Sequence, residues 1–245
     1  MYPVLFRIGT LEITSFGVMV AIGALVGVRV FRRELAQGGL PASAVDAAIA
    51  GVVGGLVGAK TLWVVEHLGE APFTDLLFSR GGMSWFGGLA GGIGTGLTVL
   101  WWRRIPVVAA LAAATPALAI GHAIGRIGCF LVGDDYGRPT DLAWGVAFPR
   151  GLPPTDVPVH PTQLYEAFAL ALVAWGLLRW RRQDVPDAIV LGRYLILAGS
   201  IRFAIEFIRV NVRLVGPFTL AHLVSLALVV IGIGLVLSTP VGPRE

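Results

Sequence analysis

Long apolar runs separated by short polar segments dominate the chain. A bilayer core is crossed by a helix of roughly 20 apolar residues, and several runs reach about that length. The segments between them carry glycine and proline, which favour turns. We therefore expect an all-α, polytopic membrane protein with about seven transmembrane helices. These helices are expected near residues 13–32, 45–66, 83–102, 106–124, 162–179, 188–208 and 218–238.

The run at 106–124 differs from the others because Thr115-Pro116 interrupts it. Proline removes a backbone donor and tends to kink or break a helix. This segment is therefore expected either to cross the membrane or to enter it as a broken element. If all seven segments cross, the two termini lie on opposite sides.

Composition agrees with this interpretation and limits the chemistry. The chain is 56% hydrophobic and 14% charged, whereas a soluble domain has about 25% charged residues. We expect a single transmembrane domain over 1–245, with a polar segment at 125–161, and a first helix that is retained rather than cleaved. Cys129 is the only cysteine, which excludes an internal disulfide and a multi-cysteine metal site. No metal, cofactor or nucleic-acid partner is expected.

Arginines cluster at the C-terminal ends of the first, third and fifth predicted helices and near the C-terminus of the chain. If all seven segments cross, these positions lie on one side of the membrane. By the positive-inside rule that side is cytoplasmic. The N-terminus and the polar segment 125–161 are then outside, and the C-terminus is cytoplasmic. The arginines that support this orientation are Arg29, Arg32, Arg33, Arg103, Arg104, Arg179, Arg181, Arg182 and Arg244.

A second group of charged residues lies on or toward the outer side, where the positive-inside rule does not expect arginines, and needs a functional reason. Arg126 follows an apolar run, and Arg202, Glu206 and Arg209 share one face of the sixth predicted helix at i, i+4 and i+7. One interpretation is a self-satisfied charge ladder between helices. The other is a site for an anion, because Glu206 can neutralise only one arginine. Guanidinium groups bind phosphate through paired hydrogen bonds, so a phosphate group is the expected guest.

Several short motifs, in order along nearly the whole chain, resemble the bacterial prolipoprotein diacylglyceryl transferase family. They are VLFRIG (4–9) with SFG (15–17), GGMSWFGGL (81–89), GRIGCFLVGDDYG (125–137), HPTQLYE (160–166) and RFAIEFIR (202–209). The resemblance implies a multi-pass enzyme of the bacterial cytoplasmic (inner) membrane. Such an enzyme moves the diacylglyceryl group of phosphatidylglycerol to the lipobox cysteine thiol of a prolipoprotein signal peptide. A thioether forms and glycerol phosphate leaves. Membrane lipids surround the site.

Matching the family motifs residue by residue gives the expected site. Arg126 and Arg202 would stabilise the leaving phosphate and Glu206 would orient Arg202, with His160 as a further catalytic candidate. Arg126, Arg202, Arg209, Asp134 and Gly137 are the expected substrate-binding residues.

The chain departs from the family pattern at positions that matter for proton transfer. Phe86 stands where many members have a histidine, and Phe16 where they have a tyrosine. The signature's asparagines are matched by Cys129 and Val132, and its glutamate by Asp134. The base for the thiol is therefore open between His160, His122, Asp134 and Glu206, or the arginines act without one. Cys129 is expected to be a packing residue.

Two other functions remain compatible with the sequence. One is a family paralogue that binds phospholipid or transfers another lipid group. The other is a small membrane transporter, against which the lack of a clear internal repeat weighs. Further alternatives concern single features: His160 as a backbone cap, the Asp134-Asp135 pair as a weak metal site, and glycines that let the second and third helices pack closely.

Overall fold

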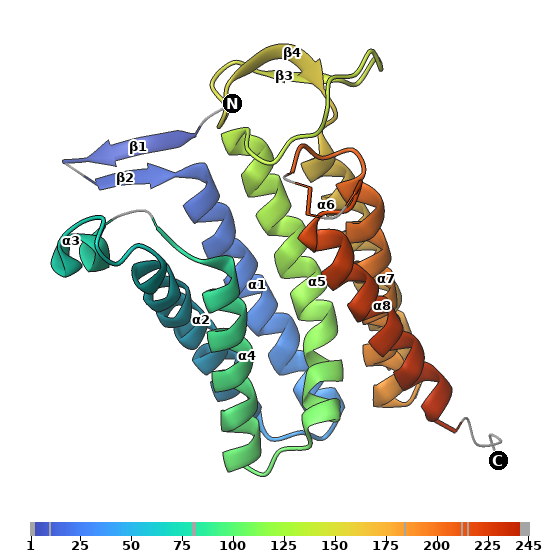
Figure 1. The fold of residues 1–245 in the computed structure, drawn as a ribbon. Helices are drawn as coiled ribbons and strands as arrows, with labels where there is room; N and C mark the ends of the chain where they lie inside the picture. Colours follow the sequence, from blue (N-terminus) through green and yellow to red (C-terminus); the bar gives the residue numbers. More distant parts are fainter. Residues whose placement is uncertain are drawn as a thin grey trace. The chain divides into compact units, whose positions relative to one another are not determined.

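The computed structural model describes most of the chain, and it is mainly helical (Figure 1). Gly81 of the GGMSWFGGL motif and Arg244, used above for the orientation, lie outside the described residues, as do the side chains of Ile8, Leu11 and Trp85. The described ranges are 3–9, 11–79, 82–183, 185–211, 213–214 and 216–240.

The long helices of the described chain correspond to the predicted ones. They are α1 (Ser15–Gln37), α2 (Val45–Glu66), α4 (Trp85–Trp102), α5 (Val107–Val132), α6 (Thr162–Arg181), α7 (Asp187–Glu206) and α8 (Leu220–Ser238). Shorter elements are η1 (Ala42–Ala44) and α3 (Phe73–Phe78). Two antiparallel hairpins, which the sequence analysis did not predict, pair β1 (Val4–Ile8) with β2 (Leu11–Thr14) and β3 (Val146–Phe148) with β4 (Thr155–Val159).

Helices long and apolar enough to cross a bilayer make this a multi-pass membrane protein. Within the described residues five segments meet that criterion. Because α4 and α6 are not among the five, the number of seven crossings stays a prediction. The five are Ser15–Gln37, Ala42–Glu66, Val107–Val132, Asp187–Glu206 and Leu220–Ser238.

Helix α5 is continuous and longer than the sequence indicated, so of the two alternatives for this segment the broken element is wrong. Pro116 has no N–H to offer the carbonyl of Ala112, but the Thr115 hydroxyl donates to that carbonyl at 2.9 Å. The orphaned acceptor is thus satisfied within the helix. The helix ends at Val132, and the next residue, Gly133, has a φ of 81°, the left-handed conformation common after a helix. Arg126 therefore lies inside a helix and not in a polar loop.

The chain forms two compact units. The first unit contains residues 1–31 and 111–245, and it holds the charged residues of the predicted site. In its core, α5, α6 and α7 pack through small and branched apolar side chains. The buried members are Ala112, Ala119, Val173, Ala174, Leu177 and Val190. Helix α1 runs antiparallel to α5, with Gly23 against the backbone of Gly121 and Gly128 against Phe16 and Met19.

The second unit, residues 32–110, is built around the α2–α4 pair. Glycines allow the two backbones to touch: a Cβ on Gly58 would lie 2.4 Å from the Gly87 carbonyl oxygen, and one on Gly91 would lie 2.3 Å from that of Gly54. Contact through small residues is typical of membrane helices. The packing interpretation of these glycines is therefore confirmed.

Candidate functional site

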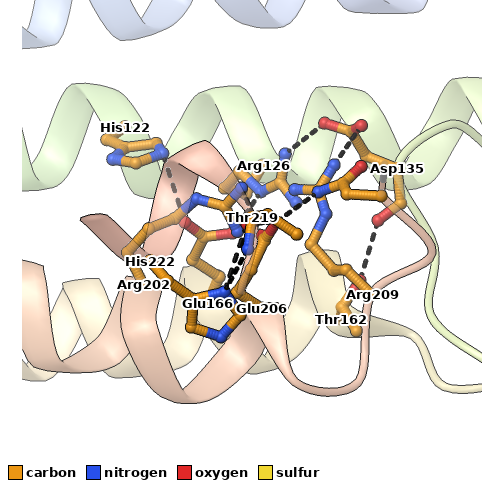
Figure 2. Close-up of polar contacts among 11 residues, drawn as sticks. His122, Arg126, Asp135, Thr162, Glu166, Arg202, Glu206, Arg209, Thr219 and His222 are labelled. Atoms are coloured by element: carbon orange, nitrogen blue, oxygen red, sulfur yellow. Dashed lines mark hydrogen bonds and ion pairs between the residues drawn. The ribbon is translucent and has the colours of Figure 1, made fainter. Parts of the chain in front are cut away.

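The candidate site lies where several elements of the first unit meet. Helix α5 ends there, α6 begins, α7 ends, and the segment before α8 returns (Figure 2). Arg126 of the GRIGCFLVGDDYG motif and Arg202 and Arg209 of the RFAIEFIR motif come together at this point. The predicted convergence of the arginines is thus present.

Arg126 is buried, with 6% of its surface exposed, and it contacts two carboxylates. Its Nε lies 2.9 Å from Oε2 of Glu166, on the first turns of α6. Its Nη1 donates to Oδ2 of Asp135 at 2.8 Å. A buried guanidinium requires such partners, because an unpaired charge is costly away from water.

Arg202 and Glu206 form the i, i+4 ion pair that the sequence predicted. Arg202 Nη2 lies 2.7 Å from Oε2 of Glu206. The other oxygen of this carboxylate, Oε1, accepts hydrogen bonds from the Thr219 hydroxyl (2.6 Å) and from Asn211 Nδ2 (2.8 Å). Glu206 is therefore held from three directions, and it fixes the end of α7 next to the start of α8.

Asp135 connects Arg126, in its own motif, to Arg209 at the end of the RFAIEFIR motif. Its two oxygens face Arg126 and Arg209, which donates to Oδ1. Burial raises the pKa of Asp135, but the positive charges of Arg209 and Arg126 outweigh this effect, and the net pKa is below its ordinary value. The carboxyl group is consequently ionised at neutral pH and bridges two guanidinium groups.

The backbone around Asp135 is fixed by close contacts. Asp135 has a positive φ of 60°, and the Thr162 hydroxyl donates to its carbonyl at 2.8 Å. Gly137 donates its N–H to the carbonyl of His160 at 2.9 Å, and a Cβ on Gly137 would lie 2.8 Å from the Ile208 carbonyl oxygen. Gly137, a predicted substrate-binding residue, thus has a packing role in this structure.

The predicted surplus of positive charge is wrong, because the sequence analysis counted only Glu206 as a counter-charge. Glu166 and Asp135 supply two further carboxylates, so the three arginines face three acids. Donors nevertheless remain. Nη2 of Arg126 and Nη1 of Arg202 are buried and have no hydrogen-bond partner among the described residues. Buried donors without partners are rare in folded proteins and call for a guest such as water or an anion.

A pocket of about 350 Å³ lies at the same end of this unit. Its cationic side chains are Arg138, Arg209 and Arg213, against the single carboxylate of Glu206. This pocket does carry an excess of positive charge. Its remaining lining residues are Phe207, Val210, Asn211, Pro217 and Thr219.

Three other residues of the sequence analysis lie beside this network. The His160 ring faces Tyr165, with Nδ1 3.4 Å from the hydroxyl oxygen. Asp134 is half-buried against the Cys129 thiol, and burial raises the pKa of its carboxyl group. Cys129, Asp134 and Asp135 could offer three metal ligands, but Arg126 Nη1 already approaches Cys129 Sγ at 3.6 Å. A resident cation at this point disfavours a metal ion.

Two residues of the network were missed from sequence. Glu166 is 2% exposed, and its signal was an ionisable group among apolar neighbours of a predicted helix, a pattern typical of functional membrane residues. The sequence analysis considered Asp135 only as half of a weak metal site. Its role depends on Arg126 and Arg209 meeting in space, which sequence spacing does not reveal.

The fold and the site define a multi-pass membrane protein with a buried arginine–carboxylate cluster at one end of its helices. Residues 3–238 match the family model described as prolipoprotein diacylglyceryl transferase. Three relatives named phosphatidylglycerol–prolipoprotein diacylglyceryl transferase are similar over most of both chains. That of Geobacter sulfurreducens is 34% identical, covering 94% of this chain and 92% of its own. That of Methylococcus capsulatus is 33% identical (94% and 92%), and that of Clostridium tetani 31% (95% and 96%). The chain belongs to the prolipoprotein diacylglyceryl transferase family.

Proposed function

We propose that this protein transfers the diacylglyceryl group of phosphatidylglycerol to the lipobox cysteine thiol of a prolipoprotein signal peptide. The names of its relatives support the two substrates. The observation that carries the proposal for the site is the pair of buried, unpartnered donors, Nη2 of Arg126 and Nη1 of Arg202. A phosphate group has the negative oxygens that such donors bind.

In this reaction the thiolate attacks the glyceryl carbon that carries the phosphate oxygen. The S–C bond forms as the C–O bond breaks, and the electron pair leaves with the phosphate of glycerol phosphate. Arg126 and Arg202 stabilise the charge that develops on this leaving group, since preformed donors act most strongly in a site shielded from water.

The carboxylates position these guanidinium groups instead of competing for all their donors. Glu166 and Asp135 contact Nε and Nη1 of Arg126, which leaves Nη2 for the substrate. Glu206 contacts Nη2 of Arg202, which leaves Nη1 for the substrate. A charge-balanced cluster also reduces the cost of burying each arginine.

The pocket lined by Arg138, Arg209 and Arg213 receives the glycerol phosphate head after the C–O bond breaks. Its excess positive charge suits the added negative charge of a phosphate monoester. Arg209 links this pocket to Asp135. Asp134 and Gly137 shape the adjoining loop, and His160 anchors the start of α6.

The protein acts in the bacterial cytoplasmic membrane, with seven crossings, an external N-terminus and a cytoplasmic C-terminus. The site then faces outward, where a signal peptide presents its lipobox. The same proposal treats residues 1–245 as one transmembrane domain and places the polar segment 125–161 outside.

The proposal is tested with purified protein, phosphatidylglycerol and a lipobox peptide. Wild-type protein is expected to release glycerol phosphate and to increase the peptide mass by one diacylglyceryl group. Arg126→Lys and Arg202→Lys keep the charge but lose the planar donors, so kcat is expected to fall about 100-fold or more. Arg150→Lys is the matched control, because Arg150 is an exposed loop residue.

Normal rates in both site variants would overturn the assignment of the arginines. Wild-type protein that binds phosphatidylglycerol but leaves the peptide unmodified would instead favour a lipid-binding paralogue.

A further inference from the structure

His122 lies one helical turn before Arg126 on α5, on the same face. Its side chain is 49% exposed, and its Nε2 lies 3.6 Å from Oε1 of Glu166. Figure 2 shows the ring with one nitrogen toward Glu166 and the other directed away from it. The imidazole is therefore both accessible and tied to the charged cluster.

Glu166 connects His122 to Arg126. One carboxylate oxygen faces the imidazole and the other lies 2.9 Å from Nε of Arg126. The Glu166 side chain is only 3% exposed, so its position is set by its neighbours in the protein. A carboxylate beside an imidazole fixes the ring orientation and stabilises the protonated form.

The other two described histidines of this unit are occupied differently. His222 is 2% exposed, and its Nδ1 accepts a hydrogen bond from the Thr219 N–H at 3.1 Å. Aromatic rings of Phe203, Phe207 and Phe218 surround it. His160 faces Tyr165. Among these three imidazoles, His122 alone combines an exposed ring with a contact to the acid that holds Arg126.

We propose that His122 accepts the proton of the thiol nucleophile and that Glu166 orients it, an inference that rests on the proposed transfer reaction. With Nε2 protonated and facing Glu166, Nδ1 takes the S–H proton. The sulfur electron pair forms the S–C bond, and the C–O electron pair leaves with glycerol phosphate. His122 then returns its proton to water, and the enzyme is restored.

Proton transfer gives two charged products, the imidazolium of His122 and the thiolate of the substrate, and the surrounding charges act on both. The charged groups facing His122 are Glu166 of α6, Arg126 of α5 and Arg202 of α7. In water the transfer from a thiol to an imidazole is unfavourable by about two pKa units, or roughly 100-fold. Glu166 favours the imidazolium and the two arginines oppose it. The same arginines stabilise the thiolate, and this effect on the thiol reduces the gap.

The test compares wild-type protein with His122→Gln in the transfer assay across pH 6 to 9. At pH 6.5 kcat of His122→Gln is expected to fall about 100-fold. The deficit is expected to shrink as pH approaches about 8.5, where the thiol ionises unaided. Phosphatidylglycerol binding is expected to stay within about twofold. In His122→Ala, added imidazole is expected to restore part of kcat.

His67→Gln is the matched control, since His67 belongs to the second unit and bonds the Trp63 carbonyl. Equal kcat for wild type and His122→Gln at pH 6.5 would overturn the role of His122 and leave the transfer reaction standing. No product from wild type would overturn both. If His122→Gln does not fold, His122→Ala decides: recovery of kcat with added imidazole supports His122, and no recovery contradicts it.

Discussion

At the residue scale, the site depends on how carboxylates share the guanidinium donors. Arg126 has two acidic partners, and Arg202 has one, yet each keeps one buried nitrogen unpartnered. An arginine offers five N–H donors in a fixed plane, so acids can hold it from one side while another side stays available. Charge balance and anion binding are therefore compatible in the same cluster.

Asp135 gives this cluster a defined pH dependence. Its folded-state pKa is below the ordinary value despite burial, because Arg209 and Arg126 favour the charged form. The stability that it contributes is present above an unfolded pKa of about 3.9 and is lost as pH falls through the folded value. Asp135→Asn is expected to lower the unfolding temperature at pH 6 and to flatten its decline below pH 4.

The measurement is thermal unfolding in detergent between pH 3 and pH 7. Asp141→Asn is the control, because Asp141 is an exposed residue of the same polar segment. A wild-type profile that Asp135→Asn leaves unchanged would contradict the bridging role of this carboxylate.

At the scale of single elements, α5 carries Arg126 to the site only because it continues through Pro116. The Thr115 hydroxyl replaces the missing N–H at the Ala112 carbonyl. Thr115→Val is nearly isosteric and leaves that buried acceptor unsatisfied. We expect it to lower the free energy of unfolding by about 1–3 kcal/mol.

A double-mutant cycle isolates this effect. In a Pro116→Ala background the new N–H reaches the Ala112 carbonyl, so Thr115→Val is expected to cost less than half as much. Denaturant unfolding in detergent gives the four free energies. Equal costs of Thr115→Val in both backgrounds would show that the hydroxyl does not compensate for the proline.

The α2–α4 pair offers a similar comparison between two glycines. A Cβ on Gly58 would lie 2.4 Å from a backbone oxygen, whereas one on Gly94 would meet nothing within 4 Å. Gly58→Ala is expected to lower the free energy of unfolding by about 1–3 kcal/mol through overpacking. Gly94→Ala is expected to be neutral or to stabilise α4 by up to about 1 kcal/mol. The reverse order of the two unfolding midpoints would contradict this packing.

At the scale of the whole molecule, the long helices could be predicted because apolar length is a direct signal of a bilayer crossing. The hairpins could not, since strands such as β3 with three residues are too short for a reliable pattern. The continuity of α5 depended on one side-chain hydrogen bond. The arginines of the site were predicted from charges in unusual places, whereas Glu166 and Asp135 took their meaning from partners distant in sequence.

The proposed orientation predicts which positions are accessible from outside the cell. In a Cys129→Ser background, Leu5→Cys and Asp141→Cys are expected to react with a membrane-impermeant maleimide on intact cells. Ser238→Cys is expected to react only after permeabilisation, because an odd number of crossings separates it from Leu5. Labelling of Ser238→Cys on intact cells would contradict seven crossings with an external N-terminus.

The central claim is that Arg126 and Arg202 bind one phosphate of the lipid substrate through their unpartnered nitrogens. An experimental structure with bound phosphatidylglycerol tests it most directly. The account predicts phosphate oxygens about 2.8 Å from Nη2 of Arg126 and Nη1 of Arg202. A headgroup bound elsewhere, with both nitrogens still turned toward protein or water, would contradict it.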